Sequence, residues 1–390
     1  MKKLILTLVL VFCTALCLVA CGSEPTDKPE DKEVTYKIAM VTDYGDITDQ
    51  SFNQATYEGC KNWAEANKVD FKYFKPATNS DDDRIQSTKD AIAAGYNVIV
   101  MPGYAFAPTI EAVASKFADV KFIALDVAKG DLLAAHFGKD YDYNPDNEKW
   151  ASYQLPANVY CAVYQEEIAG FFAGYAAVKE GFTKLGFLGG MSVPAVIRYG
   201  QGFVQGADKA AQEMDKEIEI KYVYGGQFFG DADITAVMDT WYAAGTEVVF
   251  ACGGGIFTSA GEAAKKVGKY VIGVDVDQKA TIDALYGEGM TVTSAMKGLY
   301  ATVQTTLTNL ITNGKWESKI ENLGLVSATE VEKNYVQLPV ATWSMKNYKV
   351  EDYKALVGKI YNKEITVSAE LSHFAVSAKT TVSYQEDIKK

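Results

Sequence analysis

The sequence predicts an α/β protein of two lobes, each a parallel sheet flanked by helices, with a ligand cleft between the lobes. Short apolar runs alternate with amphipathic helical patterns from residue 36 onward, and this alternation begins again near residue 158. Strands that alternate with helices favour parallel sheets covered on both faces. Residues 36–390 are also long enough for two domains of ordinary size. Domain interfaces are favoured places for ligand pockets, so we expect the cleft to bind a ligand.

The N-terminus has the pattern of a lipoprotein signal. Lys2 and Lys3 provide a positive region, Leu4–Phe12 is apolar, and Leu-Val-Ala-Cys-Gly at positions 18–22 resembles the bacterial lipobox. We therefore predict a signal peptide over residues 1–20 and lipidation of Cys21. An uncleaved anchor helix is the alternative, although the apolar run is short for a membrane span. The pattern predicts an extracytoplasmic protein, held at the cell membrane by its lipid.

Residues 21–35 are predicted to be a tether, because SEPTDKPEDKEVT is rich in charge and proline and nearly free of apolar mass. The whole chain has a formal net charge of −12, which argues against nucleic acid as a partner. It has only two histidines, and the cysteines after Cys21 (Cys60, Cys161 and Cys252) are scattered. We expect the protein to bind neither a metal nor a cofactor. We also expect it to be a monomer, and its three remaining cysteines to be buried.

The N-terminal lobe is predicted to comprise residues 36–157 and 279–323. Its expected strands are Lys37–Thr42, Asp70–Phe74, Asn97–Met101, Lys121–Leu125 and Asp131–Phe137. Helical patterns occupy Asp82–Ala94 and Pro108–Phe117. A further apolar run at Val292–Met296 is expected to return to this lobe.

The C-terminal lobe is predicted to comprise residues 158–278 and 324–390. Its expected strands are Asn158–Tyr164, Leu185–Gly189, Ile218–Tyr224, Glu247–Ala251 and Tyr270–Val274. Helices are expected to begin near Glu166, Val196, Ala232 and Ser259. The sequence after Leu323 has the weakest pattern, and its topology is left open.

Polar and glycine residues follow several of these strands, where ligands collect in an open parallel sheet. The first such stretch, VTDYGDITDQSFNQATYEG at residues 41–59, predicts a strand end, a polar loop and a helix start. Phe52 either caps the hydrophobic core or forms a stacking platform for a flat ligand. Gly253–Gly255 favours tight turns over a phosphate cradle, because its spacing matches neither phosphate-binding motif.

This stretch resembles the first motif of the basic membrane protein family, the lipoprotein substrate-binding components of ABC importers that include a purine nucleoside receptor. The likeness continues in order through QEEIAGFFAG, LGFLGG, QGFVQGA, IGVDVDQ and TSAMKG, at residues 165–174, 185–190, 201–207, 272–278 and 293–298. It implies a type I periplasmic-binding-protein fold that closes on its ligand about three crossovers. It also implies a purine nucleoside (guanosine, inosine or adenosine) as ligand, and an ABC permease with its ATPase as partners.

The resemblance also implies roles for individual residues. Phe52 and Phe228 match two aromatics that sandwich the purine, although Phe229 is an alternative to Phe228. The positions that read the base match Asp43, Asn53 and Asp126. The ribose hydroxyls would be bound by Asp275 and Lys297, with backbone near Gly254. The family's usual A-G-G-T-G-x-G is replaced here by ACGGGIF, which puts the contacts of that loop in doubt.

Three other functions remain open on the sequence. The cleft could bind another small polar ligand, such as a sugar or an amino acid, or the lobes could signal to a membrane partner without transport. A secreted nucleoside hydrolase could use Asp43 and Asp126 as acid and base. The chain lacks a clustered metal-binding Asp motif of the form D-x-D-x-x-x-D-D, and Asp81–Asp83 is better explained as a helix N-terminus. We therefore favour a binding protein over an enzyme.

Overall fold

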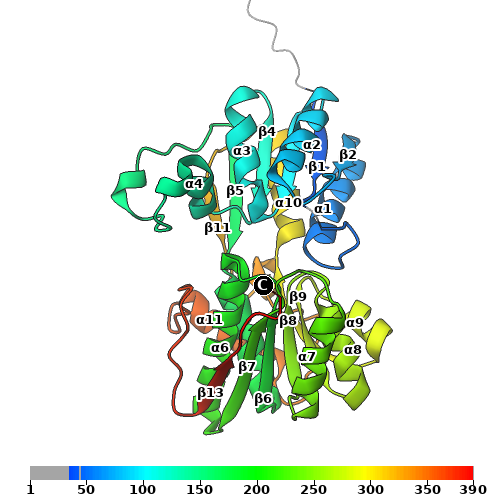
Figure 1. Ribbon diagram of the computed structural model, residues 1–390, viewed down its shortest axis with the longest axis vertical. Helices are drawn as coiled ribbons and strands as arrows, with labels where there is room; N and C mark the ends of the chain where they lie inside the picture. Colours follow the sequence, from blue (N-terminus) through cyan, green and yellow to red (C-terminus); the bar gives the residue numbers. More distant parts are fainter. Residues whose placement is uncertain (1–34, 44, 390) are drawn as a thin grey trace, which may run out of the picture. The chain divides into compact units, whose positions relative to one another are not determined.

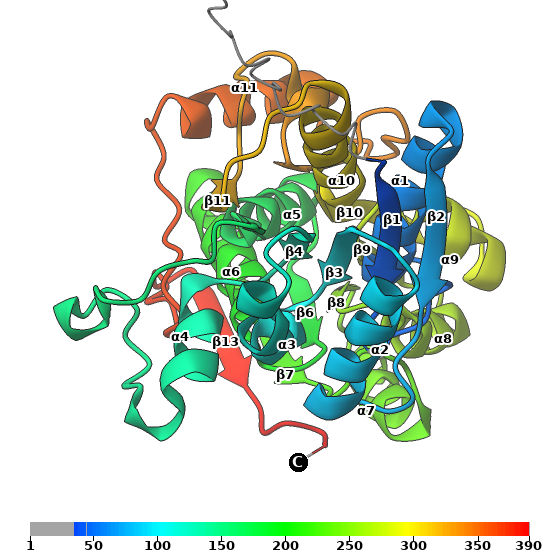
Figure 2. The same cartoon turned by 90° about the horizontal axis from the view of Figure 1, so that it is seen from above.

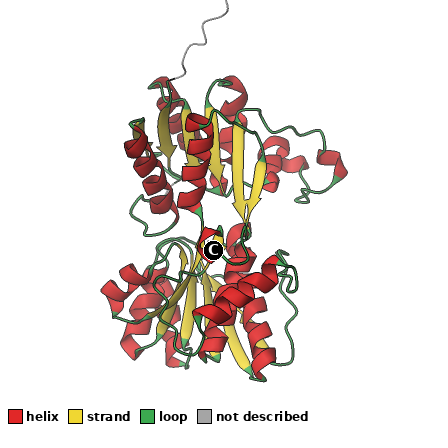
Figure 3. Cartoon of the chain, turned by 180° about the vertical axis from the view of Figure 1, so that it is seen from behind, coloured by secondary structure: helices red, strands yellow, loops and turns green. Residues whose placement is uncertain are grey.

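The computed structural model describes residues 35–43 and 45–389, so the predicted signal peptide, Cys21 and most of the tether lie outside the described residues. Residues 36–390 form one compact unit that contains two β-sheets. Both sheets are flanked by helices (Figure 3). The α/β architecture with two covered parallel sheets is therefore confirmed.

The first sheet has the strand order β11-β5-β4-β3-β1-β2, and each of its pairs is parallel. Together with α1–α4 and α10 it forms the N-terminal lobe (Figure 1). The strands are β1 Lys37–Val41, β2 Asp70–Phe74, β3 Val98–Pro102, β4 Lys121–Leu125, β5 Val159–Tyr164 and β11 Ile320–Leu323. The helices are α1 Phe52–Asn67, α2 Asp81–Ala93, α3 Ala107–Val113, α4 Lys129–Phe137 and α10 Leu299–Leu307.

The second sheet has the order β12-β10-β9-β8-β6-β7-β13 and forms the C-terminal lobe with α5–α9 and α11. Every pair in it is parallel except β10 with β12. The strands are β6 Lys184–Gly189, β7 Ile218–Tyr224, β8 Val248–Cys252, β9 Tyr270–Asp275, β10 Thr291–Lys297, β12 Val336–Gln337 and β13 Thr380–Tyr384. The helices are α5 Glu166–Glu180, α6 Pro194–Met214, α7 Ala232–Ala243, α8 Phe257–Val267, α9 Lys279–Tyr286 and α11 Val350–Tyr361.

Two predicted lobe boundaries are wrong. Strand β5 was expected to open the C-terminal lobe, but it pairs with β4 in the first sheet. Strand β10 was expected to return to the N-terminal lobe, but it pairs with β9 in the second sheet. The chain therefore crosses between the sheets at Gln165, at Gly298 and between Leu323 and Val336. An apolar strand looks the same in either sheet, so the pattern alone could not place these two.

One predicted strand is a helix. Residues 131–137 lie in α4, whose first turn is stabilised by Asp131, because this carboxylate accepts a hydrogen bond from the Ala128 N–H at 2.8 Å. An apolar run this short does not distinguish a strand from a buried helix. Asp131 at the third helical position was the available signal.

The C-terminal lobe is built on a close contact between α5 and α6. Both helices carry glycines four residues apart, and a methyl group at any of them would overlap the backbone of the facing helix; they are Gly170, Gly174, Gly202 and Gly206. Small residues at these positions allow the two backbones to approach. The contact places the first turn of α5 beside the first turns of α6, and the two helices lie side by side in Figure 2.

Candidate functional site

A cavity of about 380 Å³ lies between the two lobes, at the carboxyl ends of strands from both sheets. This is where ligands collect in open parallel sheets, and the volume falls in the range of small-molecule sites. The structure brings all eight predicted ligand-binding residues to the wall of this cavity: Asp43, Phe52, Asn53, Asp126, Phe228, Gly254, Asp275 and Lys297. Tyr104 and Tyr199 also line it.

Asp49 organises the loop that leads into α1. Its carboxylate accepts hydrogen bonds from the backbone N–H groups of Ser51, Asn53 and Gln54, at 2.9, 2.9 and 3.0 Å. These are N–H groups that the first turn of a helix leaves without intrahelical partners. Burial raises the pKa of Asp49 to about 6, although these hydrogen bonds oppose the shift. Because Asp49 caps the helix, the Ser51 hydroxyl is left for another contact.

That contact crosses between the lobes. The Ser51 hydroxyl donates to Asp275 Oδ2 at 2.6 Å, and both residues are buried. Beside it, Gln278 Nε2 donates to the Gln50 carbonyl at 3.0 Å, and the Thr281 hydroxyl donates to Gln50 Oε1 at 3.1 Å. Gln50 and Ser51 belong to the N-terminal lobe and their partners to the C-terminal lobe, so we name these three hydrogen bonds the interlobe clasp.

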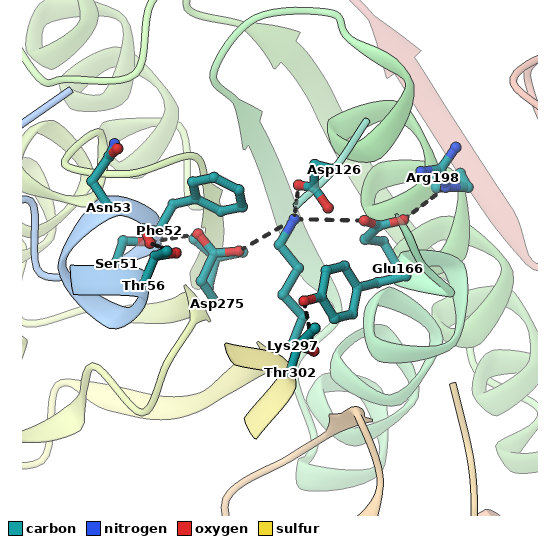
Figure 4. A network of polar contacts seen from close by, with 12 residues as sticks. Ser51, Phe52, Asn53, Thr56, Asp126, Glu166, Arg198, Asp275, Lys297 and Thr302 are labelled. Carbon is teal, nitrogen blue, oxygen red and sulfur yellow. Dashed lines mark hydrogen bonds and ion pairs between the residues drawn. The ribbon is translucent and has the colours of Figure 1, made fainter. Parts of the chain in front are cut away.

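Lys297 is the centre of the site's charge network (Figure 4). Its ammonium pairs with Asp126 and lies 3.5 Å from Glu166 Oε1 and 3.9 Å from Asp275 Oδ1, and its side chain is only 3% exposed. Burial lowers the pKa of Lys297, but attraction to the carboxylates outweighs burial and raises this pKa above its ordinary value. The ammonium also lies 4.8 Å from the centre of the Phe52 ring, which is within cation–π range.

The two carboxylates beside Lys297 follow strand ends in the same unusual backbone conformation. Asp126 comes after β4 and Asp275 ends β9, with φ angles of 58° and 64°. Aspartate tolerates this left-handed region better than most residues. Burial raises the pKa of both carboxyls, to about 6 for Asp126, although Lys297 opposes the shift. The conformation turns both side chains from their separate sheets toward one ammonium.

Besides the Tyr199 hydroxyl, two buried acceptor atoms at the cavity have no hydrogen-bond partner among the described residues. They are Asp126 Oδ1 and Asn53 Oδ1. The Asn53 amide nitrogen donates to Asp49 at 3.2 Å, which fixes the orientation of the amide. Buried acceptors without partners are costly, so both atoms are suited to accept hydrogen bonds from a ligand.

Sequence reasoning missed Glu166 and Arg198 as site residues. Glu166 is fully buried at the start of α5, and it accepts a 2.7 Å hydrogen bond from Arg198 Nε on α6. Glu166 contacts Lys297, and Arg198 lines the cavity. The available signal was the pair Glu166–Glu167 at the start of an otherwise apolar helix, because buried glutamates need a cationic partner.

The two candidate stacking rings come from different lobes. Phe52 is the first residue of α1, and Phe228 lies in the loop between β7 and α7; both are half-buried. Phe229 lines the cavity too, but it is 56% exposed. The Phe228 carbonyl accepts a hydrogen bond from the Gly255 N–H at 2.9 Å. Gly253 and Gly254 have positive φ angles.

The described residues show neither a cluster of His, Cys, Asp and Glu suited to a metal ion nor a helix long and apolar enough to cross a membrane. The cysteines Cys60, Cys161 and Cys252 are buried and free, as predicted.

Comparison with known proteins identifies the family. Residues 36–370 match the model of the Bmp family, described as PnrA-like substrate-binding proteins of ABC transporters. The chain belongs to the Bmp family. It is therefore a substrate-binding protein of an ABC transporter, a class that acts outside the cytoplasm.

Relatives of this Bmp protein cover most of its length. The ABC transporter nucleoside-binding protein BmpA of Lactococcus lactis is 26% identical over 292 residues, which are 71% of this chain and 75% of the relative. Basic membrane protein A of Borreliella burgdorferi is 27% identical and covers 94% of this chain and 96% of its own.

Solved structures share the fold. A solute-binding protein of an ABC transporter system from Aeropyrum pernix superposes with a TM-score of 0.62 at 19% identity, over 85% of this chain and 87% of its own. One from Conexibacter woesei also gives 0.62, at 20% identity, over 86% of this chain and 99% of its own. The predicted type I periplasmic-binding-protein fold is thus confirmed.

Proposed function

We propose that this Bmp protein is the lipid-anchored binding component of an ABC importer, and that it binds a purine nucleoside in the interlobe cavity and delivers it to the permease. The observation that carries the proposal is that two aromatic rings, one from each lobe, share the wall of one cavity with buried, unpartnered acceptors. A flat ring system with N–H groups at its edge suits that combination. A related protein in Lactococcus lactis is named as nucleoside-binding.

In this proposal the base lies between Phe52 and Phe228. Stacking on an aromatic side chain stabilises a bound base by ~1–3 kcal/mol. The N–H groups of the base donate to the first-lobe acceptors, of which Asp126 Oδ1 and Asn53 Oδ1 lack partners in the described structure. Asp43, which also lines the cavity, is the third of these acceptors. A hydrogen bond to a buried carboxylate is stronger than one between neutral groups.

The ribose lies beside Asp275 and Lys297. Asp275 accepts hydrogen bonds from its vicinal hydroxyls, and Lys297 donates to them. Gly254, with a φ of 50° and no side chain, lets the sugar approach the backbone. The negative surroundings, in which Lys297 is already matched by three carboxylates, disfavour a phosphorylated ligand.

The anchor and the delivery step complete the proposal. Lipidation at Cys21 would hold the protein at the outer face of the membrane, and the tether to residue 35 would let it reach the permease. Closure of the lobes around the nucleoside changes the surface that the permease meets. No bond of the ligand is broken, so the protein is a carrier and not an enzyme.

Calorimetry tests the proposal. Residues 36–390, which form one compact unit, are titrated with guanosine, inosine, adenosine, cytidine and ribose. We expect tight binding of purine nucleosides without release of free base. If ribose gave heat and the nucleosides did not, the ligand would be a sugar and not a nucleoside. Release of free base would make the protein a hydrolase.

Paired variants test the site itself. Phe52→Ala and Phe228→Ala should each weaken nucleoside binding by roughly 5- to 150-fold, the equivalent of one lost stacking contact. Phe229→Ala is the matched control, because its ring is mostly exposed. If Phe229→Ala weakens binding and Phe228→Ala does not, the second ring of the sandwich is Phe229.

A further inference from the structure

The last described residues run toward the binding cavity. Strand β13 pairs in parallel with β7 and forms an edge of the second sheet (Figure 1). Strand β7 ends at Tyr224, immediately before the loop that carries Phe228. We name residues 385–389, which follow β13, the C-terminal arm. The arm lies beyond residue 370, where the family match ends, so the resemblance assigns it no role.

Backbone hydrogen bonds carry the arm to the end of β7. The Gln385 N–H donates to the Tyr222 carbonyl, and the Ile388 N–H donates to the Tyr224 carbonyl, both at 2.9 Å. The Gln385 side chain accepts a hydrogen bond from Trp241 Nε1 at 3.2 Å, which attaches the arm to α7 as well. These contacts place Lys389 beside residues 225–231, the loop between β7 and α7 that we name the Phe228 loop.

Lys389 holds the loop at two points. Its backbone lies against Gly226, where an added methyl group would be 2.7 Å from the Lys389 carbonyl oxygen. Its ammonium pairs with Asp231 and lies 3.4 Å from Asp233. Asp231 Oδ2 also accepts a hydrogen bond from Gln227 Nε2 at 2.9 Å, one residue before Phe228.

Asp231 in turn fixes where the loop ends. Its other oxygen, Oδ1, accepts from the N–H groups of Asp233 and Ile234, both at 3.1 Å, and so caps α7. The Phe228 loop is thus held between β7, the cap of α7 and the arm. Gly255 also supports the loop, because its N–H group donates a hydrogen bond to the Phe228 carbonyl.

We propose that the C-terminal arm is a positioning element of the ligand site, with Lys389 holding the loop so that Phe228 faces the cavity. The inference depends on the proposed function, since it assigns the arm an effect on ligand affinity through the Phe228 ring. Residues 385–389 do not line the cavity, so Asp231 and Gly226 transmit the effect of the arm.

The first test measures the loop without any ligand. Hydrogen exchange is followed in the full chain purified in detergent, and in a variant that ends after Tyr384. We expect faster exchange at Gly225, Gly226 and Gly255, whose N–H groups hydrogen-bond along this loop. Exchange in residues 45–59 across the cavity should stay unchanged. Equal rates throughout the loop in both proteins would overturn the proposal.

The second test measures nucleoside affinity. We expect the truncation to weaken guanosine binding about tenfold and Lys389→Ala about threefold, because a partly exposed ion pair contributes little on its own. Lys389→Arg should restore affinity. Lys379→Ala is the matched control: Lys379 pairs with Asp215 at 2.6 Å, at the other end of β13.

A double-mutant cycle separates positioning from a general loss of stability. In a Phe228→Ala background the truncation should cost no further affinity, because the ring that the arm positions is already gone. An equal loss in both backgrounds would refute the proposal. If the parent protein bound no nucleoside, the proposed function would fail, while the exchange experiment would still decide whether the arm holds the loop.

Discussion

Removing the Ser51 hydroxyl should shift this protein toward its open form. Ser51→Ala deletes the buried 2.6 Å hydrogen bond to Asp275, which joins the N-terminal lobe to the C-terminal lobe. A bond of this kind to a charged group contributes about 1.5–3 kcal/mol. Because the two residues belong to different lobes, the bond forms only when the lobes are together.

The expected magnitude follows from this bond alone. A loss of about 2 kcal/mol changes the ratio of closed to open protein roughly 30-fold. Any ligand that needs closed lobes then binds more weakly by up to the same factor. The two hydrogen bonds of Gln50 remain, so the clasp is weakened but not abolished.

Calorimetry with guanosine measures the loss, and small-angle scattering of the ligand-free protein measures lobe opening as a larger radius of gyration. Thr56→Ala is the control, because its hydroxyl donates to the Phe52 carbonyl at 3.0 Å within the same lobe. The reasoning is refuted if Ser51→Ala binds as tightly as the parent protein with an unchanged radius.

Four further predictions concern the charge network and the helix contact. Lys297→Met should lower the free energy of unfolding at pH 7 by about 3–5 kcal/mol, since it leaves buried carboxylates unpaired. The loss should be smaller at pH 5, where Asp126 is protonated, and urea denaturation measures both values. Folding raises the pKa of Asp126 from 3.8 to about 6, so the contribution of this residue to stability falls by about 3 kcal/mol as pH rises across this range. Asp126→Asn should remove that part of the dependence of unfolding free energy on pH. An unchanged dependence would contradict the assignment. Guanosine should bind more weakly below pH 6, where Asp126 is protonated, and a pH-independent dissociation constant would exclude Asp126 as its acceptor. Gly202→Ala should destabilise the protein by about 1–3 kcal/mol, because the methyl group meets the backbone of Glu167; an unchanged melting temperature would show that α5 and α6 can separate.

Most strands were predictable because their pattern is local. Strands β2, β4 and β7 have the predicted bounds, and helices α5 and α7 begin at the predicted residues. Apolar runs bounded by glycine and polar residues identify such elements without knowledge of their neighbours. The elements after Leu323, among them α11 and β13, were not predicted. The apolar residues of this segment follow no regular spacing, and they pack against elements that are distant in the sequence.

The candidate site was predictable where residues lie at strand ends. Asp43, Asp126 and Asp275 follow predicted strands, so a parallel sheet directs them to the cavity edge. Glu166 and Arg198 lie on helices instead, and only the contact between α5 and α6 brings them together. The clasp between Ser51 and Asp275 was equally hidden, because its two residues are 224 positions apart.

The sequence by itself determined the α/β class, the order of most elements and the residues that end the strands, since these depend on local patterns of apolar and polar side chains. Only the tertiary structure decided which sheet contains β5 and β10, which carboxylates surround Lys297, and that the C-terminal arm lies beside the Phe228 loop. Each of these depends on pairing between distant segments, and a strand or a charge can satisfy several partners until packing selects one.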